Sequence, residues 1–279
     1  MKEMIRKSLW FDGQFLRMKS LRFSERLVFI AKKYKALVAI GLGREGRIRF
    51  KNIDITCREF SSLGTVQSSM VDFYHDIVAP GIITTTTPHI VDIGANIGQF
   101  CNAAKLFFPK ATVYSFEPDP QVFEELEANT ESLNKVHLFN DGLSDKAQTL
   151  PFYVHPQSVM SSFSPYEGQE YAPDQIRQLK LKVFDAVFSA KQHIDLLKID
   201  VEGFETQVLH GASKSLGRTD YLLLELSLGR ATADNTNLAL LGLVQQLAPQ
   251  AKVVKFGRPL GNPKTPMCQD VLIAAGGTA

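Results

Sequence analysis

Val91-Asp92-Ile93-Gly94-Ala95-Asn96-Ile97-Gly98-Gln99-Phe100 joins a short apolar run to a glycine-containing turn and then to a helical pattern. The apolar run is short enough for a buried parallel strand. Gly94 and Gly98 remove side chains at the points where a ligand would approach the backbone. Amides at the start of the following helix would point at that ligand. The stretch therefore predicts a nucleotide-binding corner between a strand and a helix.

A second apolar run, residues 113–116, ends in Glu117 and Pro118. These residues follow the glycines by about 20 positions, which is where nucleotide-binding folds place an acid that holds the ribose hydroxyls. We therefore predict that Glu117 binds a ribose and that Pro118 lines the same site.

The corner lacks the dinucleotide-binding pattern G-x-G-x-x-G, because no middle glycine stands between Gly94 and Gly98. Without that glycine a diphosphate has less room against the helix start. With Asp92 at the strand end, the corner better suits a ligand that carries an amine and a carboxylate. S-adenosylmethionine is such a ligand, and a nicotinamide oxidoreductase is the weaker alternative.

A further block, residues 196–205, reads L-L-K-I-D-V-E-G-F-E. It resembles the L-K-I-D-x-E-G-x-E block of the FkbM family of S-adenosylmethionine-dependent methyltransferases, and residues 91–98 are similar to that family's V-D-x-G-A-N-x-G block. The resemblance extends from Ile90 to Ala275. It implies a class I Rossmann-like fold, with a mostly parallel sheet and helices on both faces. It also implies O-methylation of a hydroxyl on a sugar, glycolipid or natural product.

The expected cofactor is S-adenosylmethionine, with S-adenosylhomocysteine as its product. The acid of the turn Asn140-Asp141-Gly142 follows the third predicted strand, where methyltransferases of this fold often place an acceptor for the adenine amine. An ordinary turn residue is the alternative for Asp141. The predicted cofactor-binding residues are Asp92, Gly94, Ala95, Asn96, Gly98, Glu117, Pro118, Asp141 and Gly142.

Methyl transfer to oxygen requires alignment of donor and acceptor and loss of the hydroxyl proton. We predict Asp200 and Glu202 as the catalytic residues, with Asp200 near the cofactor and Glu202 toward the substrate. The alternative for Lys198, Glu202 and Glu205 is an ion-pair group that supports the corner, and for Lys198 this is the preferred interpretation.

Substrate contacts are predicted at Ser161, Ser162 and Glu225. The two serines lie in residues 144–183, the least regular part of the predicted catalytic domain, and long loops often carry function. A lid that does not touch the substrate is the alternative for this loop. Glu225 stands at the end of a predicted strand, where ligands bind in such sheets.

No metal is predicted, since the histidines lack the paired spacing of metal ligands. Asp200, Glu202 and Glu225 could assemble an oxygen site for magnesium, so this alternative stays open. The three cysteines are Cys57, Cys101 and Cys268, and their odd number and wide separation argue against a disulfide framework or zinc cluster.

The 279 residues are 44% hydrophobic, enough for a full core. No stretch reaches the length of a membrane span, and the first residues lack a signal-peptide core. We therefore expect a cytoplasmic protein. It is predicted to divide into a basic N-terminal extension of helix and short strands, residues 1–64, and an S-adenosylmethionine-binding domain, residues 65–279.

The N-terminal extension is strongly basic. Residues 1–51 hold 14 Lys or Arg against 4 Asp or Glu, a balance of +10, and the remaining residues hold 17 against 25, a balance of −8. This asymmetry favours packing against the acidic domain or a sister subunit, with an anionic membrane surface as the alternative. An amphipathic helix is predicted there, its apolar face formed by Leu21, Phe23, Leu27, Ile30, Tyr34, Leu37 and Val38.

The preferred function is O-methylation of a small-molecule or glycan acceptor, and two alternatives stay open. A noncatalytic cofactor-binding or scaffold subunit would keep the fold, and an RNA or protein methyltransferase would keep the cofactor. An N-P-P-aromatic motif is typical of amine methylation, and Ile199-Asp200-Val201-Glu202 stands in its place. The acidic domain would also repel a phosphate backbone, which disfavours a nucleic-acid substrate.

Regular strand and helix alternation predicts a parallel sheet. The predicted strands are 90–93, 111–116, 136–139, 150–154, 194–199, 221–226, 251–256 and 270–274, and the predicted helices are 65–79, 97–108, 120–130, 204–215 and 236–247. Two short strands or a hairpin are predicted within 48–55.

Overall fold

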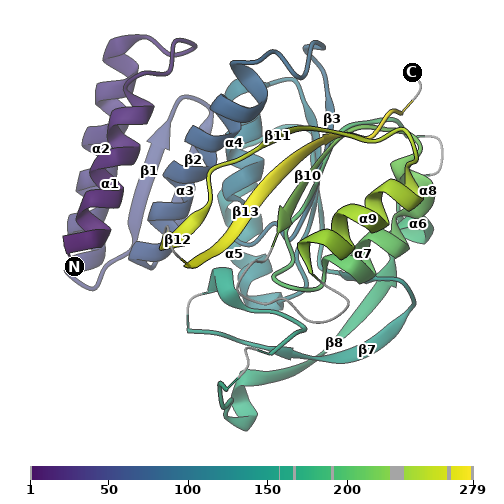
Figure 1. The fold of residues 1–279 in the computed structure, drawn as a ribbon. Helices are drawn as coiled ribbons and strands as arrows, with labels where there is room; N and C mark the ends of the chain where they lie inside the picture. Colours follow the sequence, from purple (N-terminus) through teal and green to yellow (C-terminus); the bar gives the residue numbers. More distant parts are fainter. Residues whose placement is uncertain are drawn as a thin grey trace. The chain divides into compact units, whose positions relative to one another are not determined.

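The computed structural model describes residues 2–156, 158–165, 168–189, 192–226, 236–262 and 265–277. The chain forms two compact units (Figure 1). We call them the N-terminal unit (Met1–Thr87, Ala95–Ala111 and Gln121–Val136) and the sheet unit (Pro88–Gly94, Thr112–Pro120 and His137–Ala279). The predicted boundary between residues 64 and 65 falls within a helix, and that division of the chain stays a prediction.

A mostly parallel sheet forms the centre of the sheet unit. Its strand order is β11 (Lys252–Phe256), β13 (Thr265–Ala274), β10 (Thr219–Leu226), β9 (Ile194–Ile199), β3 (His89–Ile93), β4 (Thr112–Phe116) and β5 (Val136–Phe139). The pairs β10–β9, β9–β3 and β3–β4 are parallel, whereas β13 runs antiparallel to β10 and β11. The short β12 (Leu260–Asn262) pairs with β13. The predicted Rossmann-like sheet is confirmed.

The central strands β3, β9 and β10 are mostly buried because their sequences are nearly continuous apolar runs, as expected for the interior of a parallel sheet. Val91, Leu197 and Leu224 of three adjacent strands belong to one apolar core. Helices α6 (Phe184–Val187), α7 (Glu205–Gly211), α8 (Ser213–Leu216) and α9 (Asn237–Leu247) add further apolar side chains to it, among them Val208 and Leu240.

The helix predicted over 204–215 is divided into α7 and α8 at Ala212. Gly211 explains why the chain packs closely here, since a Cβ at this position would stand 2.1 Å from the carbonyl oxygen of Ser144. Glycine also disfavours a continuous helix.

A second, three-stranded sheet has the order β6 (Gly142–Ser144), β8 (Ile176–Val183) and β7 (Gln148–Tyr153). The expectation that residues 144–183 are largely irregular was wrong for β8, which pairs with β7 over six residues. The sequence Leu179-Lys180-Leu181-Lys182-Val183 alternates apolar and polar residues, the pattern of a half-buried strand. The short helices η2 (Ser158–Met160) and η3 (Pro173–Gln175) lie between β7 and β8 in the chain.

The N-terminal unit is built from helices and a hairpin. Its elements are α1 (Lys2–Phe15), α2 (Phe23–Gly41), β1 (Gly46–Phe50), β2 (Ile53–Cys57), α3 (Phe60–Phe73), the short π-helix η1 (Tyr74–Val78), α4 (Gln99–Phe107) and most of α5 (Pro120–Thr130). Strands β1 and β2 pair antiparallel, which confirms the predicted hairpin.

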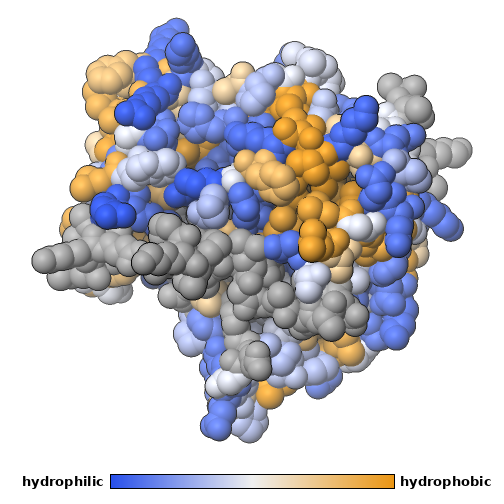
Figure 2. Space-filling model, viewed as in Figure 1, coloured by the Kyte–Doolittle hydropathy of each residue, from blue (hydrophilic) through white to orange (hydrophobic). Residues whose placement is uncertain are grey.

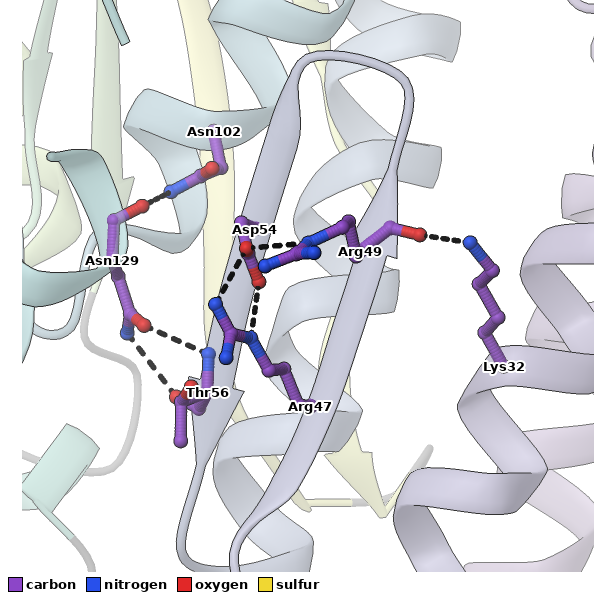
Figure 3. A network of polar contacts seen from close by, with 7 residues as sticks. All are labelled: Lys32, Arg47, Arg49, Asp54, Thr56, Asn102 and Asn129. Carbon is purple, nitrogen blue, oxygen red and sulfur yellow. Dashed lines mark hydrogen bonds and ion pairs between the residues drawn. The ribbon is translucent and has the colours of Figure 1, made fainter. Parts of the chain in front are cut away.

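Polar contacts anchor the hairpin within the N-terminal unit (Figure 3). Arg47 and Arg49 of β1 both donate to Asp54 of β2, at 2.7 and 2.8 Å. The Asn129 side chain accepts from the Thr56 amide at 2.8 Å and donates to the Thr56 carbonyl at 3.2 Å. One α5 side chain thus satisfies both backbone groups of a β2 residue, which a buried asparagine can do through its paired amide.

The apolar face predicted for the N-terminal helix differs from the buried face of α2. Phe29, Lys33, Ala36 and Ile40 are buried and recur at helical spacing. Of the predicted set only Leu21 is buried, whereas Phe23, Leu27, Tyr34 and Val38 are exposed. The spacing of apolar residues predicted the wrong face of the helix. The buried face contains Lys33, which pairs with Asp12 and is not an apolar residue.

Candidate functional site

The corner at the end of β3 is held by a very close backbone approach. Gly94 has φ +83°, and a Cβ there would lie 1.7 Å from the carbonyl oxygen of Asp200. The Asp200 amide donates to the Ile93 carbonyl at 3.1 Å, and the Gly94 amide donates to the Phe116 carbonyl at 3.0 Å. Gly94 is therefore required by the neighbouring strand end itself, a reason independent of any ligand.

The rest of the corner, residues 95–98, belongs to the N-terminal unit. Asn96 and Gly98 both have positive φ, +47° and +91°, and Ala95 is buried. The Asn96 side-chain oxygen accepts from Gln99 at 3.0 Å. Asparagine and glycine are the residues that tolerate this conformation most easily, so the sequence suits a turn that leads into α4.

A largely buried ammonium group, with 12% of its side chain exposed, joins the ends of β3 and β9. Lys198 Nζ lies 3.3 Å from Asp92 Oδ1 and 3.1 Å from Asp200 Oδ2, and it donates to the Gly94 carbonyl at 3.3 Å. Asp92 is fully buried and pairs with this ammonium, and its role in cofactor binding stays a prediction. The structure thus assigns Lys198 the supporting role that was preferred for it.

The pKa values of this group reflect burial opposed by charge. Burial raises the pKa of Asp92, and the Lys198 charge counteracts that effect. Burial lowers the pKa of Lys198, but the carboxylates of Asp200 and Asp92 outweigh burial and raise this pKa above its usual value. Lys198 therefore stays charged.

Glu117 follows β4 and is buried. Its Oε1 accepts from the Asp119 amide at 2.9 Å, and its carbonyl accepts from Asn140 at 2.9 Å, as the Pro118 carbonyl does at 3.2 Å. The carboxylate is thus fixed in orientation at the end of a parallel strand, where ligands bind.

Arg177 of β8 forms an ion pair with the buried Asp119. Sequence analysis missed this pair, because β8 itself was not predicted. The contact ties the second sheet to the segment that follows β4.

Asp141, which was predicted to bind adenine, forms an ion pair that was not predicted. Its carboxylate lies 2.8 Å from Nζ of Lys182, a side chain that is about half exposed. Gly142 begins β6, and a Cβ there would meet the Phe163 ring at 3.1 Å. The roles of both residues in cofactor binding stay predictions.

Asp200, Glu202 and Glu225 come together, with one carboxylate oxygen of each lying within 4.8 Å of the others. The strand does not continue through Asp200 and Glu202, because β9 ends at Ile199 and Glu202 has φ +55°. Glu205 accepts from the Gly203 amide at 2.9 Å, so it supports the turn through a backbone hydrogen bond.

Glu225 is the most buried carboxylate of the three, with 8% of its surface exposed. Burial and the charges of Asp200 and Glu202 raise the pKa of Glu225 well above its usual value. Asp270, its partner residue in β13, adds to this effect.

Ser161 and Ser162 both have partners within the protein. Ser162 Oγ donates to the Glu202 carbonyl at 2.6 Å and accepts from the Ser164 amide at 3.0 Å. Ser161 Oγ accepts from the His155 amide at 3.0 Å. Ser162 therefore fastens its loop to the turn that carries Glu202.

Another acid-containing group, His193, Asp195 and Asp220, also lies in the sheet unit. His193 contacts Asp220 at 3.0 Å, and Asp195 accepts from the His89 amide at 2.7 Å. These hydrogen bonds give the group a structural role.

Replacing Lys198 by Met should lower the free energy of unfolding by about 3–5 kcal/mol, because Asp92 would be left buried without its counter-charge. Urea denaturation measures the change. Adding Asp92→Asn should recover part of the loss. Lys182→Met, which breaks the more exposed pair with Asp141, is the control and should cost less than about 1 kcal/mol. Equal losses for the two single variants would contradict a special role for Lys198.

Several known methyltransferases are similar to this chain. The Methyltransferase FkbM domain model matches residues 92–247. Methyltransferase sdnD of Sordaria araneosa is 30% identical over 160 residues, which cover 46% of this chain and 62% of that protein. The 2-O-methyltransferase NoeI of Sinorhizobium fredii is 26% identical over 186 residues, covering 61% of this chain and 75% of that protein. Hexuronic acid methyltransferase AglP of Haloferax volcanii is 26% identical over 150 residues, covering 53% and 59%.

A crystal structure of methyltransferase FkbM from Methylobacillus flagellatus is 15% identical, covers 76% of this chain and 55% of that chain, and has a TM-score of 0.49. The chain spans less than two thirds of the length of sdnD and of AglP. The family model covers more than half of the chain and includes residues 92–98 and 196–205, the two blocks that form the strand ends described above. The chain belongs to the FkbM methyltransferase family.

Proposed function

We propose that this protein is an S-adenosylmethionine-dependent O-methyltransferase that acts on a hydroxyl of a sugar, glycolipid or natural product. The family match over residues 92–247 carries the proposal. The names of relatives support the acceptor class, since they include a 2-O-methyltransferase, a hexuronic acid methyltransferase and a 31-O-demethyl-FK506 methyltransferase.

The donor set at the strand ends fits this cofactor. Glu117 offers a buried, oriented carboxylate for the ribose hydroxyls, and the backbone after Gly94 leads into a helix start. We propose that Gly94, Ala95, Asn96 and Gly98 line the amino-acid part of the cofactor. Asp92 pairs with Lys198, which donates to the Gly94 carbonyl.

When bound, the cofactor supplies a methyl group on a sulfonium. The acceptor hydroxyl oxygen would take this methyl group, and the sulfur would keep the electron pair of the broken carbon–sulfur bond. The hydroxyl proton passes to a carboxylate. Asp200 and Glu202 are the carboxylates that we propose for orientation of the hydroxyl and removal of its proton, with Glu225 on the acceptor side.

Ser161 and Ser162 are assigned a positioning role in this proposal. Both hydroxyls already bind groups of the protein, and the Ser162 bond to the Glu202 carbonyl holds the turn. Acceptor contacts would then come from other parts of the same loop.

Glu117→Ala should abolish saturable binding of S-adenosylhomocysteine, or weaken it at least tenfold, because the ribose hydroxyls lose their acceptor. Isothermal titration calorimetry measures the affinity. The exposed Asp174→Ala is the matched control and should bind like the wild type. NADH serves as the competing ligand class. Binding of NADH, or no binding of S-adenosylhomocysteine to the wild type, would refute the proposal.

Asp200→Asn and Glu202→Gln should each reduce turnover by about 10²–10⁴-fold if they act on the hydroxyl proton. Formation of S-adenosylhomocysteine is measured with methyl glycosides and a hexuronic acid as acceptors, at saturating cofactor. Asp174→Asn should retain full turnover. Normal rates in both site variants would leave alignment as the source of catalysis. Tight cofactor binding without product from any acceptor would favour the noncatalytic subunit.

The N-terminal unit suggests where a lipid-linked acceptor could be met. Phe23, Leu27, Tyr34 and Val38 form one exposed stripe of α2, with Lys35 exposed nearby. Figure 2 shows apolar and hydrophilic surface interspersed over α1 and α2. Within the described residues, no helix has the length and apolar character needed to cross a membrane. We propose peripheral contact with an anionic membrane through this stripe.

Leu27→Ser combined with Val38→Ser should abolish co-sedimentation with vesicles of equal parts phosphatidylserine and phosphatidylcholine. Both side chains are exposed, so the fold should persist. Val253→Ser combined with Phe256→Ser, which removes two exposed apolar side chains from β11, is the control and should still sediment. Added salt should weaken binding. Equal sedimentation of both double variants would refute the contact.

A further inference from the structure

Negative charges gather where β9 and β10 end, beside the middle of the antiparallel strand β13. The parallel register pairs Ile199 with Leu224, so the next residues, Asp200 and Glu225, stand at neighbouring strand ends. The antiparallel register pairs Glu225 with Asp270. Like charges side by side on adjacent strands are destabilising, so this arrangement calls for a positive partner.

The ammonium of Lys198 neutralises only part of this charge. Nζ lies 3.1 Å from Asp200, but it is also shared with Asp92 and the Gly94 carbonyl. Two further carboxylates, Glu202 and Glu225, lie within 4.8 Å of Asp200.

Glu225 supplies an independent observation. More than nine tenths of this residue is buried, and its Oε2 has no hydrogen-bond partner among the described residues. The side chain does receive a hydrogen bond from the Cys268 thiol, which leaves Oε2 as the oxygen without a donor. Most buried carboxylate oxygens have a hydrogen-bond partner, so an oxygen without a donor beside two other carboxylates favours a positively charged ligand there.

We propose that Asp200, Glu202 and Glu225 bind a divalent cation that prefers oxygen ligands, such as Mg²⁺ or Mn²⁺. The three oxygens lie close enough together to share one ion, and the group contains neither histidine nor a thiolate that would favour a softer metal. The expectation of a metal-free site is revised by this proposal.

The chemistry of the ligands suggests what the cation does. A divalent ion with two or three carboxylate ligands keeps positions for water or for a substrate oxygen. In the proposed methyltransferase, on which this role depends, the acceptor hydroxyl would occupy one such position, and the cation would lower the pKa of that hydroxyl. Cation binding itself does not depend on the proposed activity.

The group His193, Asp195 and Asp220 provides a matched comparison. It also brings three potential ligand atoms within 4.8 Å of one another. Its acids, however, are satisfied by the His193 ring and by the His89 amide. An acid-to-amide change there removes the same charge without touching the proposed site.

Titration of the metal-free full-length protein with MnCl₂, followed by the electron paramagnetic resonance signal of free Mn²⁺, tests the proposal. The wild type should bind one ion per chain, with Mg²⁺ as a competitor. Glu225→Gln and Glu202→Gln should each weaken binding at least tenfold. Asp220→Asn should bind like the wild type. Because Glu225→Gln removes charge from a crowded group, its fold should persist, and the partly exposed Glu202 supplies a second variant.

Several outcomes separate this inference from the proposed function. No loss of the free Mn²⁺ signal at millimolar concentration, or equal loss in wild type and both site variants, would overturn the cation site. S-adenosylhomocysteine binding is measured on the same metal-free protein. Cofactor binding without Mn²⁺ binding would refute the cation site alone, whereas Mn²⁺ binding without cofactor binding would refute the proposed function alone.

Discussion

The ion pairs of Lys198 are the interaction on which the strand ends depend. Its ammonium compensates the fully buried Asp92 at the end of β3 and reaches Asp200 just beyond β9. Between these acids the backbone comes so close that only glycine fits at position 94. A buried charge without a partner costs far more than an exposed one. The ammonium therefore allows two acids and a side-chain-free turn to occupy adjacent strand ends.

The sequence predicted the parts of the fold where apolar pattern and length agree. Strands 136–139 and 194–199 match β5 and β9 at both ends. β8 was missed although its apolar and polar residues alternate, because it follows a stretch rich in serine and aromatic residues that indicates a loop. The exposed stripe of α2 was predicted to be its packed face for a different reason. Lys33 lies on the face that is buried, and a search for apolar residues at helical spacing does not count a lysine.

The candidate site was predictable in its residue types and less so in its contacts. The blocks at 91–98 and 196–205 pointed to the correct strand ends, because short motifs fix local backbone geometry. The contacts between Arg177 and Asp119 and between Lys182 and Asp141 join residues 58 and 41 positions apart. Such pairs depend on how β8 lies beside the other strands, which local patterns do not encode.

The conformation of Glu202 connects the turn to its chemistry. A left-handed backbone at a residue other than glycine costs about 1–2 kcal/mol, and glycine stands immediately after it, at Gly203, with φ +96°. A strand continuing past Ile199 would have placed the Asp200 and Glu202 side chains on one face, with the two residues about 6.6 Å apart along the strand. The strained turn instead brings both carboxylates beside Glu225, and Ser162 fixes the carbonyl of the strained residue. The hydrogen bond from Ser162 thus holds a turn that gathers three acids, and repulsion among these acids favours the positively charged ligand that we propose.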